Sequence, residues 1–159
     1  MPEPIVSPEI DAMAEEVLTL SQLSAVARTR KSAATAELSE PEFMALDAVL
    51  REGTITVGDV QRRIGVLPAQ MSRILRSLEK HSSGKALVES RINPDDRRRV
   101  DVTITAAGRS VHASYRRGRL SFICDFLANL EAGDRVTFMK IVRDFRSRVD
   151  LVLDGIKES

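Results

Sequence analysis

The sequence predicts a mainly α-helical protein that carries one small β-hairpin. Apolar residues recur at three- and four-residue spacing through most of the chain, which indicates amphipathic helices. One stretch near residue 100 instead alternates apolar and polar residues, as a half-buried strand does. With 159 residues, of which 43% are hydrophobic, the chain has the size and composition of one domain with its own core. We therefore expect a single domain over residues 1–159.

The first predicted helix begins at Ser7-Pro8-Glu9, where a serine N-cap precedes a proline at the first helical position. The helix should extend to about Ala36. Its apolar residues then follow one face at helical spacing: Ile10, Met13, Val17, Leu20, Leu23, Val26 and Ala27.

The second predicted helix follows the sequence "LSEPEF". Ser39 and Glu42 have the spacing of a capping box, in which each side chain bonds to the other residue's backbone N–H. Leu38 and Phe43 stand at the two positions of a hydrophobic staple. The helix should stop at Gly53, because glycine commonly ends helices.

Two further helices are predicted close together. A short one over residues 57–64 is capped by Thr56 and ended by Gly65, and the next starts with Pro68 and ends at residues 82–84. In this second helix an apolar stripe faces a core: Met71, Ile74, Leu75 and Leu78. The outward face then carries Gln70, Ser72, Arg73, Arg76, Ser77 and Lys80.

A β-hairpin should follow, with strands over residues 86–92 and 100–104. Val100, Val102 and Ile104 alternate with polar residues in the second strand. Residues 93–99, "NPDDRRR", form the turn between the strands. A turn needs Asn, Pro or Asp for its backbone angles, but it does not need three consecutive arginines. We therefore expect Arg97, Arg98 and Arg99 to serve a partner outside the fold.

Two long helices complete the prediction. Thr105 should cap the first, whose apolar residues are Val111, Tyr115, Phe122, Ile123, Phe126 and Leu130. A break near "NLEAGD" leads to the last helix, with Phe138, Val142, Phe145, Val149, Val152 and Ile156 at helical spacing.

This order of elements, with two short helices joined by a tight turn and then a hairpin, predicts a winged helix-turn-helix. A helix of this kind fits the DNA major groove, and an arginine-tipped wing reaches phosphates or the minor groove. The charge distribution agrees with a polyanion-binding lobe. Residues 61–119 contain 14 basic and 5 acidic residues, a net +9, whereas the whole chain carries +1, which leaves −8 for the ends.

The stretches "LPAQMSRILRSLEK" and "ALVESRINPDDRRRVDVTITAAG" resemble the multiple-antibiotic-resistance regulator (MarR) family of bacterial transcription factors. Asp96 and Arg98 match the family's Asp-x-Arg of the wing, and Ile104 to Gly108 match its "LT-x-x-G". Three features depart from the family pattern: the link "HSSGKA" is longer, Ser90 replaces a common arginine, and Leu67 replaces the usual Ser or Thr cap.

The resemblance implies a homodimer in which residues 7–36 and 106–157 are dimerisation helices and residues 37–105 form the DNA-binding lobe. It also implies a pseudo-palindromic operator and release by a small-molecule effector. The expected DNA-binding residues are Gln70, Ser72, Arg73 and Arg76 on the helix and Arg97, Arg98 and Arg99 on the wing. We expect Asp96 to stabilise the wing by pairing with Arg98.

Other function classes find no support in the sequence. No nucleophile–base set, glycine-rich phosphate loop or catalytic carboxylate pair is present, so we expect no enzyme and no cofactor. His81 and His112 are too few and too far apart for a metal site. Cys124, the single cysteine, excludes an intramolecular disulfide and lies among apolar residues, so it is expected to be buried and inert.

The preferred function is therefore a sequence-specific DNA-binding regulator, most simply a homodimeric repressor. The alternative is a winged-helix module that binds other proteins without specific DNA binding. The N-terminus is acidic and proline-rich, unlike a signal peptide, and no apolar run approaches the ~20 residues of a membrane span. We expect no membrane partner and a cytoplasmic location.

Overall fold

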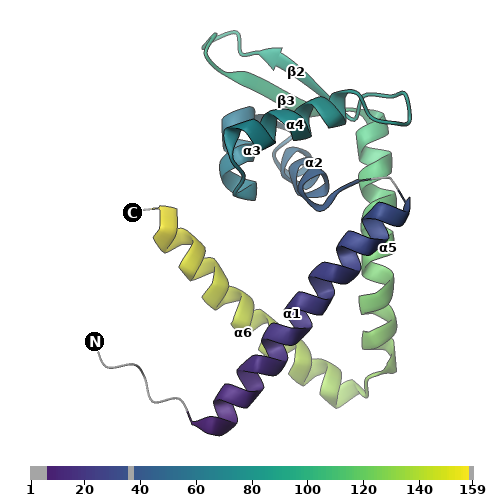
Figure 1. Cartoon of the computed structure of the whole chain (residues 1–159), viewed down its shortest axis with the longest axis vertical. Helices are drawn as coiled ribbons and strands as arrows, with labels where there is room; N and C mark the ends of the chain where they lie inside the picture. Colours follow the sequence, from purple (N-terminus) through teal and green to yellow (C-terminus); the bar gives the residue numbers. More distant parts are fainter. Residues whose placement is uncertain (1–6, 36–37, 158–159) are drawn as a thin grey trace. The chain divides into compact units, whose positions relative to one another are not determined.

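The computed structural model describes residues 7–35 and 38–157, and the chain divides into two compact units at Tyr115–Arg116. The predicted fold class, mainly helical with a small β-wing, is confirmed (Figure 1). The elements are α1 (Pro8–Thr35), α2 (Glu40–Glu52), β1 (Thr54–Thr56), α3 (Val57–Ile64), α4 (Pro68–Glu79), β2 (Val88–Ile92), β3 (Val100–Ile104), α5 (Ala106–Asn129) and α6 (Ala132–Lys157).

Local capping signals fix most of the helix ends. The Ser7 hydroxyl oxygen accepts a hydrogen bond from the Ile10 N–H at 3.3 Å, as expected of an N-cap. The predicted end of this helix, near Ala36, lies outside the described residues. The Glu42 carboxylate accepts a 2.6 Å bond from the Ser39 N–H, so the pairing predicted at the start of α2 is confirmed.

Helix α3 has the predicted bounds and caps. The Thr56 hydroxyl oxygen accepts a bond from the Asp59 N–H at 3.1 Å. Gly65 ends the helix with φ 69°, in the left-handed region where glycine carries no steric penalty. The turn between α3 and α4 is therefore short, and it leads directly into Pro68 at the first position of α4.

The sheet has three strands, in the order β1-β3-β2, rather than the predicted two. Strand β3 is central and antiparallel to both neighbours: Thr54 pairs with Thr103, and Val88 pairs with Ile104. The prediction missed β1 because three residues are too few to show alternation. Only its β-branched composition, Thr-Ile-Thr, favoured a strand.

Two predicted boundaries are wrong by a few residues, and one hydrogen bond accounts for both. The Leu87 N–H donates to the Leu78 carbonyl at 2.8 Å. In a longer helix this carbonyl would accept a bond from the Ser82 N–H, so its use by Leu87 keeps α4 from reaching the predicted residues 82–84, and the helix ends at Glu79. Because Leu87 is held there, β2 begins at Val88 instead of Ala86.

The core lies in what we call the lobe, residues 38–115. Fourteen hydrophobic side chains are buried there, and they come from every element of the lobe between α2 and α5 except β1. Leu46 of α2, 0% exposed, is among the largest, and Leu38 and Phe43 both join this cluster. Met71, Ile74 and Leu78 bury the predicted stripe of α4, and its opposite face is exposed.

Apolar side chains on α1, the distal half of α5 and α6 remain exposed. Phe122, for example, is 77% exposed, although Phe126 and Phe138 pack edge to face at 5.4 Å. Cys124 is exposed as well, so its predicted burial is wrong for the single chain. Its apolar neighbours Ile123 and Phe126 are exposed too. No helix among residues 7–35 and 38–157 has the length and apolar character of a membrane span.

Candidate nucleic-acid interface

Helix α4 presents an exposed polar face. Gln70, Ser72, Arg73 and Arg76 are all exposed, because the buried stripe of the helix turns them away from the core. The Ser72 hydroxyl donates to the Pro68 carbonyl at 3.1 Å, which leaves its oxygen free to accept a further bond. Neither Arg73 nor Arg76 forms an ion pair with a described residue, so both guanidinium groups remain available.

The wing turn is organised by Asn93, whose role the sequence prediction missed. Its side-chain oxygen accepts bonds from the N–H groups of Asp95 and Asp96 at 2.9 and 3.0 Å. Its side-chain amide donates to Asp101 at 2.8 Å. Asparagine side chains at turns commonly bond the backbone two residues further along the chain. Asn93 at the start of the turn was therefore the signal that could have predicted this role.

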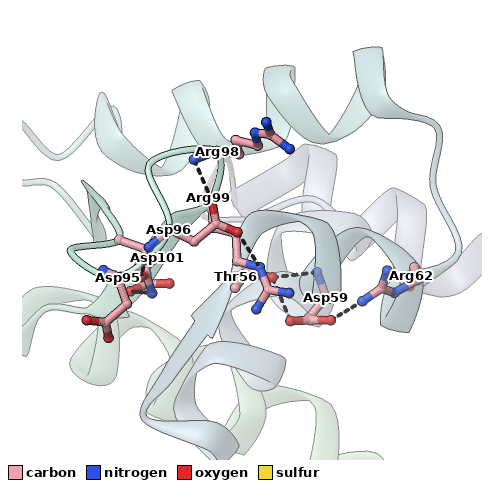
Figure 2. A network of polar contacts seen from close by, with 9 residues as sticks. Thr56, Asp59, Arg62, Asp95, Asp96, Arg98, Arg99 and Asp101 are labelled. Carbon is pink, nitrogen blue, oxygen red and sulfur yellow. Dashed lines mark hydrogen bonds and ion pairs between the residues drawn. The ribbon is translucent and has the colours of Figure 1, made fainter.

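Asp96 holds the second half of the turn, but its ion pair differs from the one predicted. The carboxylate accepts a bond from the backbone N–H of Arg98 at 3.0 Å, while it pairs with the Arg99 guanidinium at 3.4 Å. The Arg98 guanidinium points away from Asp96 (Figure 2). The two residues are therefore linked through the backbone, which leaves the Arg98 side-chain charge uncompensated.

Arg99 also lies in a polar network at the start of α3 (Figure 2). Here the Thr56 hydroxyl donates to Asp59 at 2.6 Å, and Arg62 forms an ion pair with the same carboxylate. The hydrogen bond from Thr56 lowers the pKa of Asp59, with smaller contributions from Arg62 and from the nearby charge of Arg99. Arg99 is thus part of the lobe's internal network, unlike Arg97 and Arg98, which are exposed and have no ion pair among the described residues.

The stretch that follows the wing anchors the hairpin to α5. The Thr105 hydroxyl donates to the Ala86 carbonyl at 2.7 Å and accepts from the Gly108 N–H at 2.9 Å. A Cβ added to Gly108 would lie 2.1 Å from the Leu87 carbonyl oxygen. Only glycine allows this close approach. These contacts explain why Thr and Gly stand three residues apart in the stretch from Ile104 to Gly108.

A polar pair, of which only His112 is buried, joins α2 to α5. His112 is 3% exposed, and its Nε2 lies 3.0 Å from the Asp47 carboxylate. The His112 ring stacks on Phe43, with centroids 5.0 Å apart. Burial acts to raise the pKa of Asp47, but hydrogen bonds from Arg51 and His112 outweigh it and lower that pKa. The sequence prediction considered His112 only as a metal ligand.

Other basic residues named from the sequence already have carboxylate partners. Arg62 and Arg63 of α3 are engaged with Asp59 and Glu52, respectively. In the part of the chain that the structure describes, no cluster of three or more His, Cys, Asp or Glu side chains has a geometry that holds a metal ion.

Comparison with known proteins gives a consistent result. Residues 38–100 match the MarR family model. A helix-turn-helix-type transcriptional regulator of Mycobacterium tuberculosis is 29% identical over 142 residues, which cover 89% of this chain and 90% of the relative.

Two solved structures share the fold. MarR from Escherichia coli superposes with a TM-score of 0.67 at 18% identity, covering 91% of this chain and 98% of that one. BpsR from Bordetella bronchiseptica, whose DNA binding is regulated by 6-hydroxynicotinic acid, gives a TM-score of 0.62 at 20% identity, with 84% and 98% covered. Residues 38–100, from α2 to the turn of the wing, therefore form a MarR-family domain, and over most of its length the chain is similar to helix-turn-helix transcriptional regulators.

Proposed function

We propose that this MarR-family regulator is a homodimeric repressor that binds a pseudo-palindromic operator in double-stranded DNA. The observation that supports DNA contact by the lobe is a set of four exposed arginines without ion pairs to described residues: Arg73, Arg76, Arg97 and Arg98. Arg62 and Arg63 of α3, by contrast, each pair with a carboxylate. Phosphates and guanine edges are the natural partners of guanidinium groups left open in this way.

The proposed roles differ between α4 and the wing. Gln70, Ser72, Arg73 and Arg76 contact base edges in the major groove, since a recognition helix reads bases there. Arg97 and Arg98 contact phosphates or the minor groove. Arg99, the third wing arginine, contributes mainly by holding the wing with Asp96, given their 3.4 Å pair.

The proposed dimer interface uses residues near 8–30 and 120–157. Its support is the exposed apolar side chains of α1 and α6, which a soluble monomer would leave in water. Accordingly, we propose the predicted division, with residues 7–36 and 106–157 for dimerisation and residues 37–105 for DNA binding; the start of α5, up to Tyr115, also packs in the core of the lobe. An isologous dimer presents two copies of α4 related by a two-fold axis, so its operator should be a pseudo-palindrome.

We further propose that a small molecule releases the dimer from its operator in the cytoplasm. The support is the shared fold of BpsR, a protein whose DNA binding responds to 6-hydroxynicotinic acid. No residue of this chain identifies the ligand, so we propose no chemical class for it.

Salt-dependent binding to duplex DNA tests the function directly. Genomic fragments that the protein retains would be titrated by fluorescence anisotropy between about 50 and 200 mM salt. We expect the logarithm of affinity to fall linearly with the logarithm of salt concentration, because phosphate contacts release counterions. A protein that retains no fragment even at low salt would instead be a winged-helix module for protein partners.

A further inference from the structure

Leu67 is an exposed apolar residue at the tip of the recognition helix. Its side chain is 74% exposed, more than that of any other large hydrophobic residue of the lobe. It occupies the N-cap position of α4, with φ −73° and ψ 154°, and it makes no side-chain capping bond. A leucine here neither joins the core nor satisfies the free N–H groups of the helix, as Ser, Thr or Asp would. Folding therefore does not account for it.

The first turn of α4 is also poor in hydrogen-bonding side chains. Leu67, Pro68 and Ala69 are consecutive and exposed, and Gln70 is the first residue with a polar side chain. Proline contributes no N–H group either. This tip is suited to apolar contact, and its backbone is held in place because Pro68 fixes its own φ and restricts the residue before it.

The major groove offers one apolar group to such a tip. Base edges there carry hydrogen-bond donors and acceptors, except for the C5-methyl group of thymine, which proteins read by contact with apolar side chains. The N-terminal residues of a recognition helix are those that reach base edges. From the position, exposure and chemistry of this tip, we propose that Leu67 contacts a thymine methyl group in each operator half-site and so determines specificity there.

This inference rests on the proposed DNA-binding function, and the experiment separates the two. The probe is a duplex selected by the wild-type protein from a pool of randomised sequences. Each thymine is then replaced singly by deoxyuridine, which removes the methyl group and keeps base pairing. We expect one thymine position per half-site to be sensitive, with about a fourfold loss of affinity for each methyl group removed.

Leu67→Ser is the decisive variant, because it removes the apolar contact and supplies the missing cap. We expect the melting temperature of Leu67→Ser to equal or exceed that of the wild type. Its affinities for the thymine and deoxyuridine duplexes should become equal at the sensitive position. Met44→Ser is the matched control: Met44 is an exposed apolar residue of α2, 41% exposed, outside the proposed interface. This variant should keep the fourfold difference.

Three distinct outcomes would overturn, respectively, the DNA-binding function, the methyl contact and the role of Leu67. If no duplex is enriched from the pool, the DNA-binding function itself fails. If a duplex is enriched but no deoxyuridine substitution weakens binding, the methyl contact does not exist. If Leu67→Ser retains the thymine preference of the wild type, a methyl group is read but another residue reads it.

Discussion

The lobe, residues 38–115, and the ends of the chain, which are α1 and the residues beyond 115, use similar helices in opposite ways. In the lobe, each helix turns its apolar stripe into a core shared with the sheet, and Leu46 is fully buried. In α1 and α6, stripes of similar spacing remain in water, and Leu20 is 66% exposed. Apolar periodicity alone does not distinguish these cases. It predicts that an apolar helix face is buried, but it does not show whether that face packs against the same chain or against another one.

The surfaces differ between the two regions in a related way. The lobe completes its own core and keeps open arginines on its surface, whereas the ends carry exposed apolar side chains. Because the lobe buries its own core, its surface residues can be basic, as a polyanion partner requires, without loss of the fold. The ends are suited to another copy of the chain, because large exposed apolar faces favour association.

Truncating a core side chain should have the largest effect and sharpen this comparison. Leu46→Ala should lower the free energy of unfolding by roughly 2–5 kcal/mol, since it leaves a cavity in a packed core. Because that core lies within one chain, the loss should be the same at low and high protein concentration. Urea denaturation at two concentrations measures this.

Leu20→Ala on α1 is the matched control for that measurement. Its side chain is exposed in the single chain, so any loss should arise from the dimer and be seen as weaker association. A loss as large as that of Leu46→Ala under conditions where the protein is monomeric would contradict the distinction between the regions.

Within the lobe, the helix and the wing should contribute differently to DNA binding. Arg73→Ala should cost about 1–3 kcal/mol at its operator base pair and relax specificity there. Arg98→Ala should weaken binding to all duplexes and reduce the salt slope by roughly one for each lost phosphate contact. Equal losses for both variants on operator and on random DNA would refute this division.

A smaller effect should appear at low pH, through the pair that joins α2 to α5. The lowered pKa of Asp47 means that its contribution to stability is complete above the unfolded value, ~3.9, and is lost as the pH falls through the folded pKa. Asp47→Asn removes this titration, so its stability should decline less steeply below about pH 5 than that of the wild type. Asp95→Asn on the exposed wing serves as the control, and an identical change in slope there would argue against a special role of the Asp47–His112 pair.

Most of the helical fold was predictable because its signals are local. Thr56, Gly65 and Pro68 act within a few residues of the boundaries they set, and α3 and the start of α4 lie where predicted. Strand β1 was missed because its evidence is not local: it pairs with β3, which lies more than 40 residues further along the chain. The early end of α4 likewise depends on Leu87, which returns to bond Leu78.

The exposure of the proposed site residues was predictable from the sequence, but their internal pairing was not. The sequence suggests that arginines on the wing are meant for a partner, yet it does not show which of them the wing itself uses. Arg99 pairs with Asp96 because the turn organised by Asn93 brings these side chains together. Burial of Cys124 was predicted from its apolar neighbours, and it failed because those neighbours are exposed in the single chain.

A half-turn insertion in the operator tests the central claim, that the ends join two lobes into one DNA-reading dimer. In the selected duplex, the half-sites should lie about 10 base pairs apart, centre to centre, so that both copies of α4 enter major grooves on one side. Inserting about five base pairs, half a turn, places the second groove on the opposite side. We predict that affinity falls to that of a duplex with one half-site. Affinity unchanged by the insertion would contradict a dimer whose lobes are coupled through its ends.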